Sequence, residues 1–187
     1  MLRDVMTLPK INVADGVYGP REDSYLLQET VEKFAHGKVL DMGTGTGIQG
    51  ITAALKDCNV VFTDINPIAL RCAQGNAALN NVTGIFIVSD LFSEMRGRFD
   101  VIVFNPPYLP DPDDAKLKDM ALDGGANGRK YIDRFLDEYK QFLAPGGFAL
   151  LVESSLNGYE QDVLDRSAEI VAKKSVPSEE LVVLKLS

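Results

Sequence analysis

The chain has 187 residues, about the size of one domain, and its 45% apolar and 25% charged residues are ordinary for a globular protein. It carries 27 acidic residues against 19 Lys and Arg, and this net charge of −8 argues against broad, non-specific binding to nucleic-acid phosphates. One histidine and two cysteines, Cys58 and Cys72, are too few for a closed zinc site. These counts predict chemistry without a metal and without a catalytic histidine.

The same counts indicate where the protein works. Two thiols do not make a disulfide framework, and the first ten residues carry both charge signs without a long apolar run, which predicts no secretion signal. The longest apolar runs, such as residues 148–152, are too short to span a bilayer. We expect a single cytoplasmic domain over residues 1–187, with no membrane contact.

Predicted helices and strands alternate along most of the chain. Residues 22–35 have apolar side chains at helical spacing and end at a His-Gly stop signal. Short β-branched runs then predict strands, and continuous apolar strands between helices favour a parallel sheet covered on both faces. The strands are expected at residues 38–42, 59–63, 85–89, 100–104 and 148–153, and the helices between them at residues 47–56, 67–80 and 130–143.

The end of the chain follows another pattern. A helix at residues 159–165 precedes two strands, at 168–173 and 180–186, and the turn between these strands is too short for a crossover helix. The sequence therefore predicts a mostly parallel seven-stranded sheet with one antiparallel strand. The connection from Pro106 to Arg129 is long for a plain loop, so we expect it to be functional.

A glycine-rich turn follows the first strand. Gly43, Gly45 and Gly47 let the backbone approach a ligand at the carboxyl edge of the sheet, directly after Asp41. Asp64 ends the second strand, where a carboxylate can accept hydrogen bonds from both ribose hydroxyls of a nucleoside. The structural alternative is a tight turn, with the Asp64 side chain capping the next helix.

The identity of the nucleoside follows from the position of the acid. Residues 45–50 also match the G-x-G-x-x-G pattern of dinucleotide sites. The strand, however, ends near Met42, and Asp41 precedes the first glycine, which disfavours a pyrophosphate and favours a cationic ligand. S-adenosylmethionine, which carries a sulfonium and an ammonium group, fits better than NAD, and Gly45 is then a predicted cofactor contact.

Asp90 ends the third strand. Its carboxylate can accept a hydrogen bond from the exocyclic amine of an adenine, with Leu91 packed beside the ring, although an acid in this position is often only a helix cap.

Asn105-Pro106-Pro107-Tyr108 follows the fourth strand. Its two prolines fix the backbone, so that the Asn105 side-chain oxygen and the Pro106 carbonyl can both accept hydrogen bonds from one planar –NH2 group, with Tyr108 packed against it. Holding both hydrogens directs the nitrogen lone pair at an electrophile without a strong base. A rigid Pro-Pro turn is the structural alternative.

With these motifs the chain resembles the Rossmann-like class I S-adenosylmethionine-dependent methyltransferases that carry Asn-Pro-Pro-Tyr, and among them the HemK-like glutamine methyltransferases of translation release factors. Residues 17–24, 124–129 and 181–185 resemble the archaeal and eukaryotic branch. The family often has Glu where this chain has Asp41. The resemblance implies cofactor contacts from Ser24, Asp41, Gly43, Asp64, Asp90, Leu91 and Asn105.

The activity that this resemblance implies is methyl transfer to the glutamine amide of a Gly-Gly-Gln tripeptide in a class-1 release factor. Asn105, Pro106 and Tyr108 would be catalytic, and Pro107 would also bind substrate. An adenine amino methyltransferase acting on DNA or RNA is the nearest alternative, because the motif would hold that amine equally well. A lysine methyltransferase would need a base that the sequence does not show, and an inactive S-adenosylmethionine-binding module would keep the fold alone.

Two features concern partners. The acidic residues Asp111, Asp113, Asp114 and Asp119 would steer a basic substrate surface or belong to a solvated loop. Residues 85–88 are apolar and lie, in the family's sheet order, on an edge strand without a Lys or Pro to block pairing. The resemblance implies that a small zinc-binding activator protein covers this edge. The alternative is an edge hidden under helices of the same chain.

Overall fold

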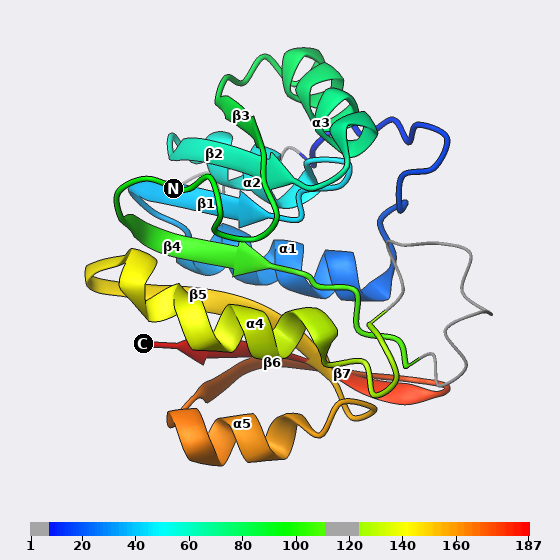
Figure 1. The fold of residues 1–187 in the computed structure, drawn as a ribbon. Coiled ribbons are helices and arrows are strands. Elements are labelled where there is room, and N and C mark those ends of the chain that lie inside the picture. Colours follow the sequence, from blue (N-terminus) through cyan, green and yellow to red (C-terminus); the bar gives the residue numbers. More distant parts are fainter. Residues whose placement is uncertain (1–7, 111–123) are drawn as a thin grey trace, which may run out of the picture.

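The computed structural model describes residues 8–110 and 124–187 and places helices on both faces of one sheet (Figure 1). The helices are α1 (Glu22–Phe34), α2 (Ile48–Ala54), α3 (Pro67–Leu79), α4 (Lys130–Glu138) and α5 (Tyr159–Arg166). The strands are β1 (Lys38–Met42), β2 (Asn59–Asp64), β3 (Ile85–Val88), β4 (Phe99–Phe104), β5 (Leu143–Ser154), β6 (Glu169–Val176) and β7 (Glu179–Leu186).

The sheet has the order β3-β2-β1-β4-β5-β7-β6. Among the described strands, β7 runs antiparallel to both of its neighbours, and every other adjacent pair is parallel. This confirms the predicted Rossmann-like sheet with one antiparallel strand, and it puts β3 on an edge. The strand order reverses between β1 and β4, and open α/β sheets bind ligands at such a point, outside the carboxyl ends of the strands.

Two apolar layers hold the sheet between its helices. On one face, α1 and α2 bury Leu27 and Ile51 against strand residues that include Phe62. On the other face, Phe135 of α4 packs on Phe104, with the ring centroids 5.1 Å apart. Because both faces of the central strands are covered, β1 and β4 are buried along almost their whole length, which fixes the positions of the loops that leave their carboxyl ends.

One predicted boundary is wrong. A single helix was expected over residues 130–143, but α4 ends at Glu138, a short 3-10 helix covers Tyr139–Phe142, and β5 begins at Leu143 rather than at residue 148. The Pro-Gly-Gly segment at residues 145–147 falls between the predicted helix and the predicted strand. It lies instead inside β5 as an irregularity, because Leu143 already pairs with Phe99 of β4 before the regular ladder resumes.

The four acidic residues expected to steer a substrate, at positions 111, 113, 114 and 119, lie outside the described residues. Within residues 8–110 and 124–187, no helix is long and apolar enough to cross a membrane.

Candidate functional site

A cavity of about 730 Å³ opens at the carboxyl edge of the parallel strands, a size typical of small-molecule sites. The loops after β1, β2, β3 and β4 surround it, together with the start of α1. Pro106 is buried and Tyr108 is half-buried, and neither is among the described residues that line it. The predicted site residues that do line it are Ser24, Asp41, Gly43, Gly45, Asp64, Asp90, Leu91, Asn105 and Pro107.

The loop after β1 folds around Asp41. Its glycines at positions 43, 45 and 47 all have φ between +54° and +85°, a region that favours glycine. Oδ2 of Asp41 accepts hydrogen bonds from Thr44 Oγ1 at 2.5 Å and from the Gly50 N–H at 2.9 Å. The side chain is 1% exposed, and this burial raises the pKa of Asp41 to about 7, against the lowering effect of the two hydrogen bonds. Asp41 therefore shapes the loop and also brings a titratable group to the cavity.

Asp64 connects two of the loops at this edge. Oδ2 accepts from the Gly45 N–H at 3.0 Å, and Oδ1 accepts from the Asn66 N–H at 2.8 Å. Burial raises the pKa of the Asp64 carboxyl. The N-cap of α3 is Asn66, whose Oδ1 accepts from the Ile68 N–H at 2.9 Å. The sequence allowed Asp64 to cap the next helix, but Asn66 has that role in the structure. Asp64 is part of the cavity wall.

Asp90 lies in a more open part of the site. Its Oδ2 accepts from Arg134 Nη2 of α4 at 3.0 Å, and both side chains are 44% exposed. Leu91 follows with φ of +47° and is buried, which turns the chain sharply behind the acid. The guanidinium therefore orients a carboxylate that the sequence placed here without a partner.

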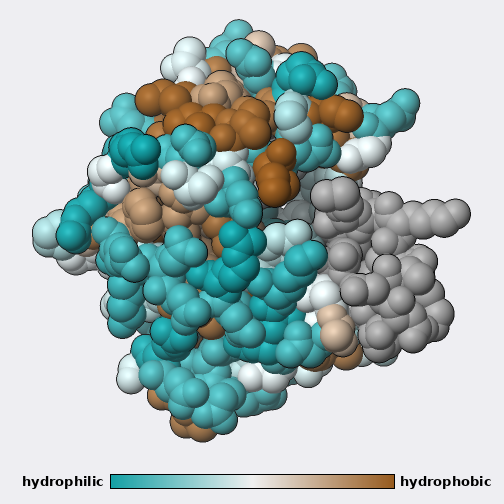
Figure 2. Space-filling view, viewed as in Figure 1, coloured by the Kyte–Doolittle hydropathy of each residue, from teal (hydrophilic) through white to brown (hydrophobic). Residues whose placement is uncertain are grey.

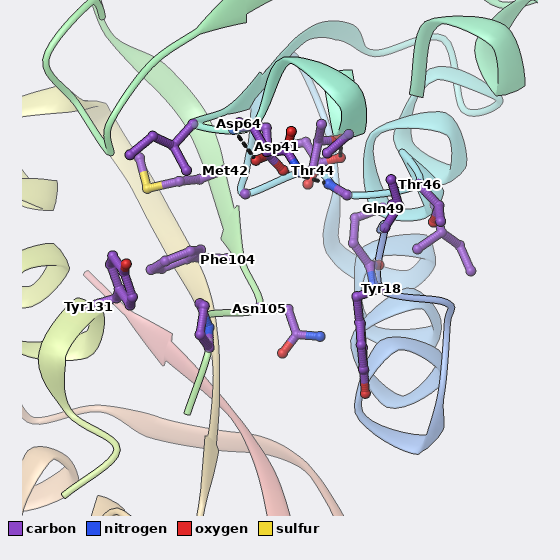
Figure 3. A pocket seen from close by; sticks show the side chains of 18 of the residues that line it. Tyr18, Asp41, Met42, Thr44, Thr46, Gln49, Asp64, Phe104, Asn105 and Tyr131 are labelled. Atoms are coloured by element: carbon purple, nitrogen blue, oxygen red, sulfur yellow. Dashed lines mark hydrogen bonds between the residues drawn. The ribbon is translucent and has the colours of Figure 1, made fainter. Parts of the chain in front are cut away.

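The side chain of Asn105 is held at one end only. Its Nδ2 donates to Oδ2 of Asp23 at 2.8 Å, while its Oδ1 is buried and has no hydrogen-bond partner in the described part of the chain. Figure 3 shows Asn105 across the cavity from the cluster of Asp41, Thr44 and Asp64. Since a buried acceptor without a partner is unfavourable, this oxygen is suited to a donor on a ligand.

Asn157 and Gly128 hold the turn that follows Asn105 in position. The Tyr108 carbonyl accepts from Asn157 Nδ2 at 2.8 Å, and Gly128 lies so close that a Cβ there would be 2.2 Å from the same oxygen. Arg129 donates to the Asn157 carbonyl at 2.9 Å and to Asp162 at 2.8 Å. Burial and the nearby charge of Asp23 raise the pKa of the Tyr108 hydroxyl, which is therefore no proton acceptor at neutral pH. Residues 124–129 thus act as the support of the Asn-Pro-Pro-Tyr turn.

Sequence reasoning missed three residues of this site. Gln49 of α2 donates from Nε2 to the Ser24 carbonyl at 2.8 Å, and its Oε1 is buried without a described partner at the cavity wall. Asp23 and Arg134 hold Asn105 and Asp90. Gln49 occupies a variable position of the glycine pattern and Asp23 resembles an ordinary acid of a first helical turn, so neither carried a signal.

The oxygen atoms that line the cavity indicate which groups it can bind. Asp41, Asp64 and Gln49 all line the cavity, and Gln49 Oε1 has no hydrogen-bond partner among the described residues. Such a set of carboxylate and amide oxygens suits cationic and hydroxyl-bearing groups. Among residues 8–110 and 124–187, no three His, Cys, Asp or Glu side chains come together to hold a metal ion.

Three comparisons with known proteins bear on this site. A protein of Methanocaldococcus jannaschii, provisionally named protein N5-glutamine methyltransferase, is 42% identical over 184 residues, covering 94% of this chain and 93% of its own. The release factor glutamine methyltransferase of Deinococcus radiodurans is 38% identical over 138 residues, covering 69% of this chain and 49% of its own. Mtq2 in the E. cuniculi Mtq2–Trm112 complex, responsible for methylation of the eRF1 translation termination factor, matches with a TM-score of 0.72 at 30% identity, covering 92% and 98% of the two chains.

The family described as methyltransferase small domain matches residues 11–176. That span contains the glycine loop, all three acidic residues of the cavity and the Asn-Pro-Pro-Tyr turn. The chain is therefore a methyltransferase that belongs to the methyltransferase small domain family.

Proposed function

We propose that this methyltransferase transfers a methyl group from S-adenosylmethionine to the side-chain amide of a glutamine, and that its substrate is the Gly-Gly-Gln segment of a class-1 release factor. The observation that carries the proposal is the buried Oδ1 of Asn105, which has no hydrogen-bond partner in the described part of the chain and lies at the edge of a cavity rich in carboxylates. Such an oxygen is stabilised by a hydrogen-bond donor, and a primary amide supplies one.

The residues at the cavity fit the cofactor. The acidic end contains Asp41 and the free acceptor of Gln49, which suits the ammonium group of an amino acid. Asp64, Asp90 and Leu91 line the same cavity. Asp64 would accept hydrogen bonds from the ribose hydroxyls, and Asp90 with Leu91 would contact the adenine. When bound, S-adenosylmethionine supplies an electrophilic methyl group on a sulfonium.

The chain's own part in the reaction is to hold and orient the amide. In this proposal the Asn105 Oδ1, which is buried at the cavity, and the Pro106 carbonyl would accept the two hydrogens of one –NH2 group and so turn the nitrogen lone pair toward the cavity. The nitrogen would gain the methyl while the bond from that methyl to the sulfonium sulfur breaks and leaves a neutral thioether. The nitrogen then releases a proton to solvent, so no side chain has to act as a strong base. Tyr108, half-buried beside the turn, gives the substrate a flat surface for packing.

The choice of substrate is supported by the relatives. Two of them carry names that specify glutamine methylation, and the complex that contains Mtq2 acts on a translation termination factor. An adenine amine would fit the same two acceptors, but the net charge of −8 repels the phosphates that a nucleic-acid substrate would bring.

The test is methyl transfer from labelled S-adenosylmethionine to a release-factor domain, to its Gly-Gly-Gln Gln→Ala variant, and to single-stranded and duplex DNA. We expect label on the release-factor domain alone. Asn105→Ala should lower kcat by about 10²–10³-fold, the usual effect of removing one aligned hydrogen-bonding group from a reaction site. Label on DNA and none on the release factor would contradict the substrate, and full activity in Asn105→Ala would contradict the mechanism.

We also propose that a small activator protein pairs with β3. This strand is an edge of the sheet, and its end residues Ile85 and Val88 are 60% and 48% exposed. Figure 2 shows apolar side chains gathered over the β3 end of the molecule. An exposed apolar edge strand is a template for pairing with another chain. The Mtq2 relative is found with Trm112, which supports a partner of this kind. That the partner itself binds zinc stays a prediction.

A further inference from the structure

Asp23, at the start of α1, is a buried acid that collects hydrogen bonds. It is 3% exposed, and its Oδ2 lies 2.8 Å from Asn105 Nδ2. Its Oδ1 accepts from the Tyr18 hydroxyl at 3.2 Å and from Ser24 Oγ at 3.2 Å. Three donors thus converge on one carboxylate, and one of them belongs to the residue proposed to bind the substrate amide.

This contact determines which end of the Asn105 amide faces the substrate. The oxygen and nitrogen ends of an amide have nearly the same shape, so packing alone does not choose between them. A carboxylate accepts hydrogen bonds and does not donate them, so only the –NH2 end of Asn105 can face Asp23. Oδ1 is then the end that faces away from Asp23, and it is buried without a hydrogen-bond partner among residues 8–110 and 124–187.

We propose that Asp23 is a positioning residue that fixes the Asn105 amide with its oxygen toward the substrate, so that the site selects a substrate –NH2 group over a group of similar shape that has no N–H donor, such as a methyl group. The inference rests on the proposed function. Tyr18 and Ser24 hold Asp23 in place, and Asp23 acts on the reaction through Asn105 rather than by touching the substrate.

The test compares the wild-type protein with Asp23→Asn, whose side chain is of similar size but can offer either end to Asn105. Two peptides are used, one with Gly-Gly-Gln and one in which a methyl ketone replaces the glutamine amide. Both side chains are neutral, so the lost charge of Asp23 does not bias the comparison. The preference is the Kd of the ketone peptide divided by the Kd of the amide peptide. We expect this ratio to be about 10- to 100-fold smaller in Asp23→Asn than in the wild type, and kcat on the amide peptide to fall by a similar factor. The Kd for S-adenosylmethionine should stay the same.

Glu22→Gln is the matched control. Glu22 is the neighbouring acid on the same helix, is exposed, and pairs with Lys174 of β6, so this variant should keep the wild-type preference and rate. If Asp23→Asn does not fold, Tyr18→Phe removes one donor from Asp23 and should shift the same ratio by a smaller factor.

An unchanged amide-over-ketone preference in a folded Asp23→Asn protein would overturn the inference. So would a loss of rate that is accompanied by weaker S-adenosylmethionine binding at constant preference, because that result describes a structural role. Absence of methyl transfer by the wild-type protein would instead contradict the proposed function. An active wild type with an unchanged ratio in the variant contradicts this inference alone.

Discussion

At the scale of single residues, three carboxylates at one sheet edge have three different environments. Asp41 is buried inside its own loop, with one oxygen taken up by Thr44 and Gly50. Asp64 is bound by two backbone N–H groups, and Asp90 is half-exposed and paired with an arginine of α4. Burial raises the pKa of Asp41 to about 7, so its charge depends on pH in the neutral range and the cofactor can change it.

The pKa of Asp41 predicts how cofactor binding depends on pH. A cation near Asp41 favours the ionised carboxyl, so the pKa of Asp41 is lower in the complex than in the free protein and binding releases a proton. Affinity for S-adenosylmethionine should therefore rise as pH increases from about 6 to about 8. Calorimetry in buffers of different ionisation enthalpy measures both the Kd and the released proton.

The Asp41→Asn variant should bind S-adenosylmethionine more weakly than the wild type, and its Kd should not change across this pH range. Asp64→Asn is a useful comparison, because it should weaken binding without removing the change near pH 7. A wild-type Kd that is constant across this pH range would contradict the role given to Asp41.

The site residues that the sequence could identify lie at strand ends, and those that it could not identify depend on contacts between distant elements. Asp41, Asp64 and Asn105 each lie at the end of a strand or one residue from it, and strand ends are brought together by the sheet, so their proximity follows from the order of the elements. Asp23 meets Asn105 across 82 positions of sequence through one side-chain hydrogen bond. A contact of that kind depends on how α1 is set against the sheet, and neither residue's own surroundings in the sequence record it.

At the scale of elements, two helical glycines contrast sharply. Gly50 of α2 faces the sheet, and a Cβ at this position would lie 2.2 Å from the Phe62 ring and 2.9 Å from Oδ2 of Asp41. Gly75 of α3 has nothing within 4 Å of the same built position. The first glycine lets α2 lie close enough to donate its N–H to Asp41, and the second has no such task.

These glycines predict opposite effects of the same substitution. Gly50→Ala should lower the free energy of unfolding by about 1–3 kcal/mol, because it overpacks the core, and it should also weaken S-adenosylmethionine binding by displacing Asp41. Gly75→Ala should be neutral or stabilise by up to about 1 kcal/mol, since alanine loses less conformational entropy in a helix. Urea unfolding with and without cofactor measures both effects. Equal stability of the two variants would contradict the packing of α2 described above.

The boundary between α4 and β5 shows the limit of pattern reasoning for elements. Helical periodicity continues through residues 139–143, and a Pro-Gly-Gly segment follows, so the sequence favours a long helix and then a turn. The structure ends the helix earlier, because Leu143 pairs with Phe99 at the beginning of β4. Such a pairing between distant strands outweighs local preference and has no local signature.

At the scale of the whole molecule, the two edges of the sheet are unlike. The β3 edge is short and apolar, whereas β6, at the opposite edge, carries Lys173 and Lys174, which are typical of edges protected from pairing. A partner that pairs as an added strand should therefore choose β3.

Charge placed on each edge tests that choice. Ile85→Lys should abolish co-purification with a co-expressed activator protein, and Ile170→Lys on β6 should leave it intact, because only the first variant puts a charge on the apolar edge. Both positions are exposed, so the free energy of unfolding of each isolated variant should lie within about 0.5 kcal/mol of the wild-type value. Loss of the complex in Ile170→Lys, or its survival in Ile85→Lys, would place the partner elsewhere.

The most direct measurement of the central claim is mass spectrometry of a release-factor domain after incubation with the protein and S-adenosylmethionine. We predict that one peptide, the one containing Gly-Gly-Gln, gains the mass of a single methyl group in place of hydrogen, that fragmentation assigns this gain to the glutamine side chain, and that Asn105→Ala slows this modification by about 10²–10³-fold. A methyl group found on a lysine or on another residue, with the glutamine unchanged, would contradict the claim.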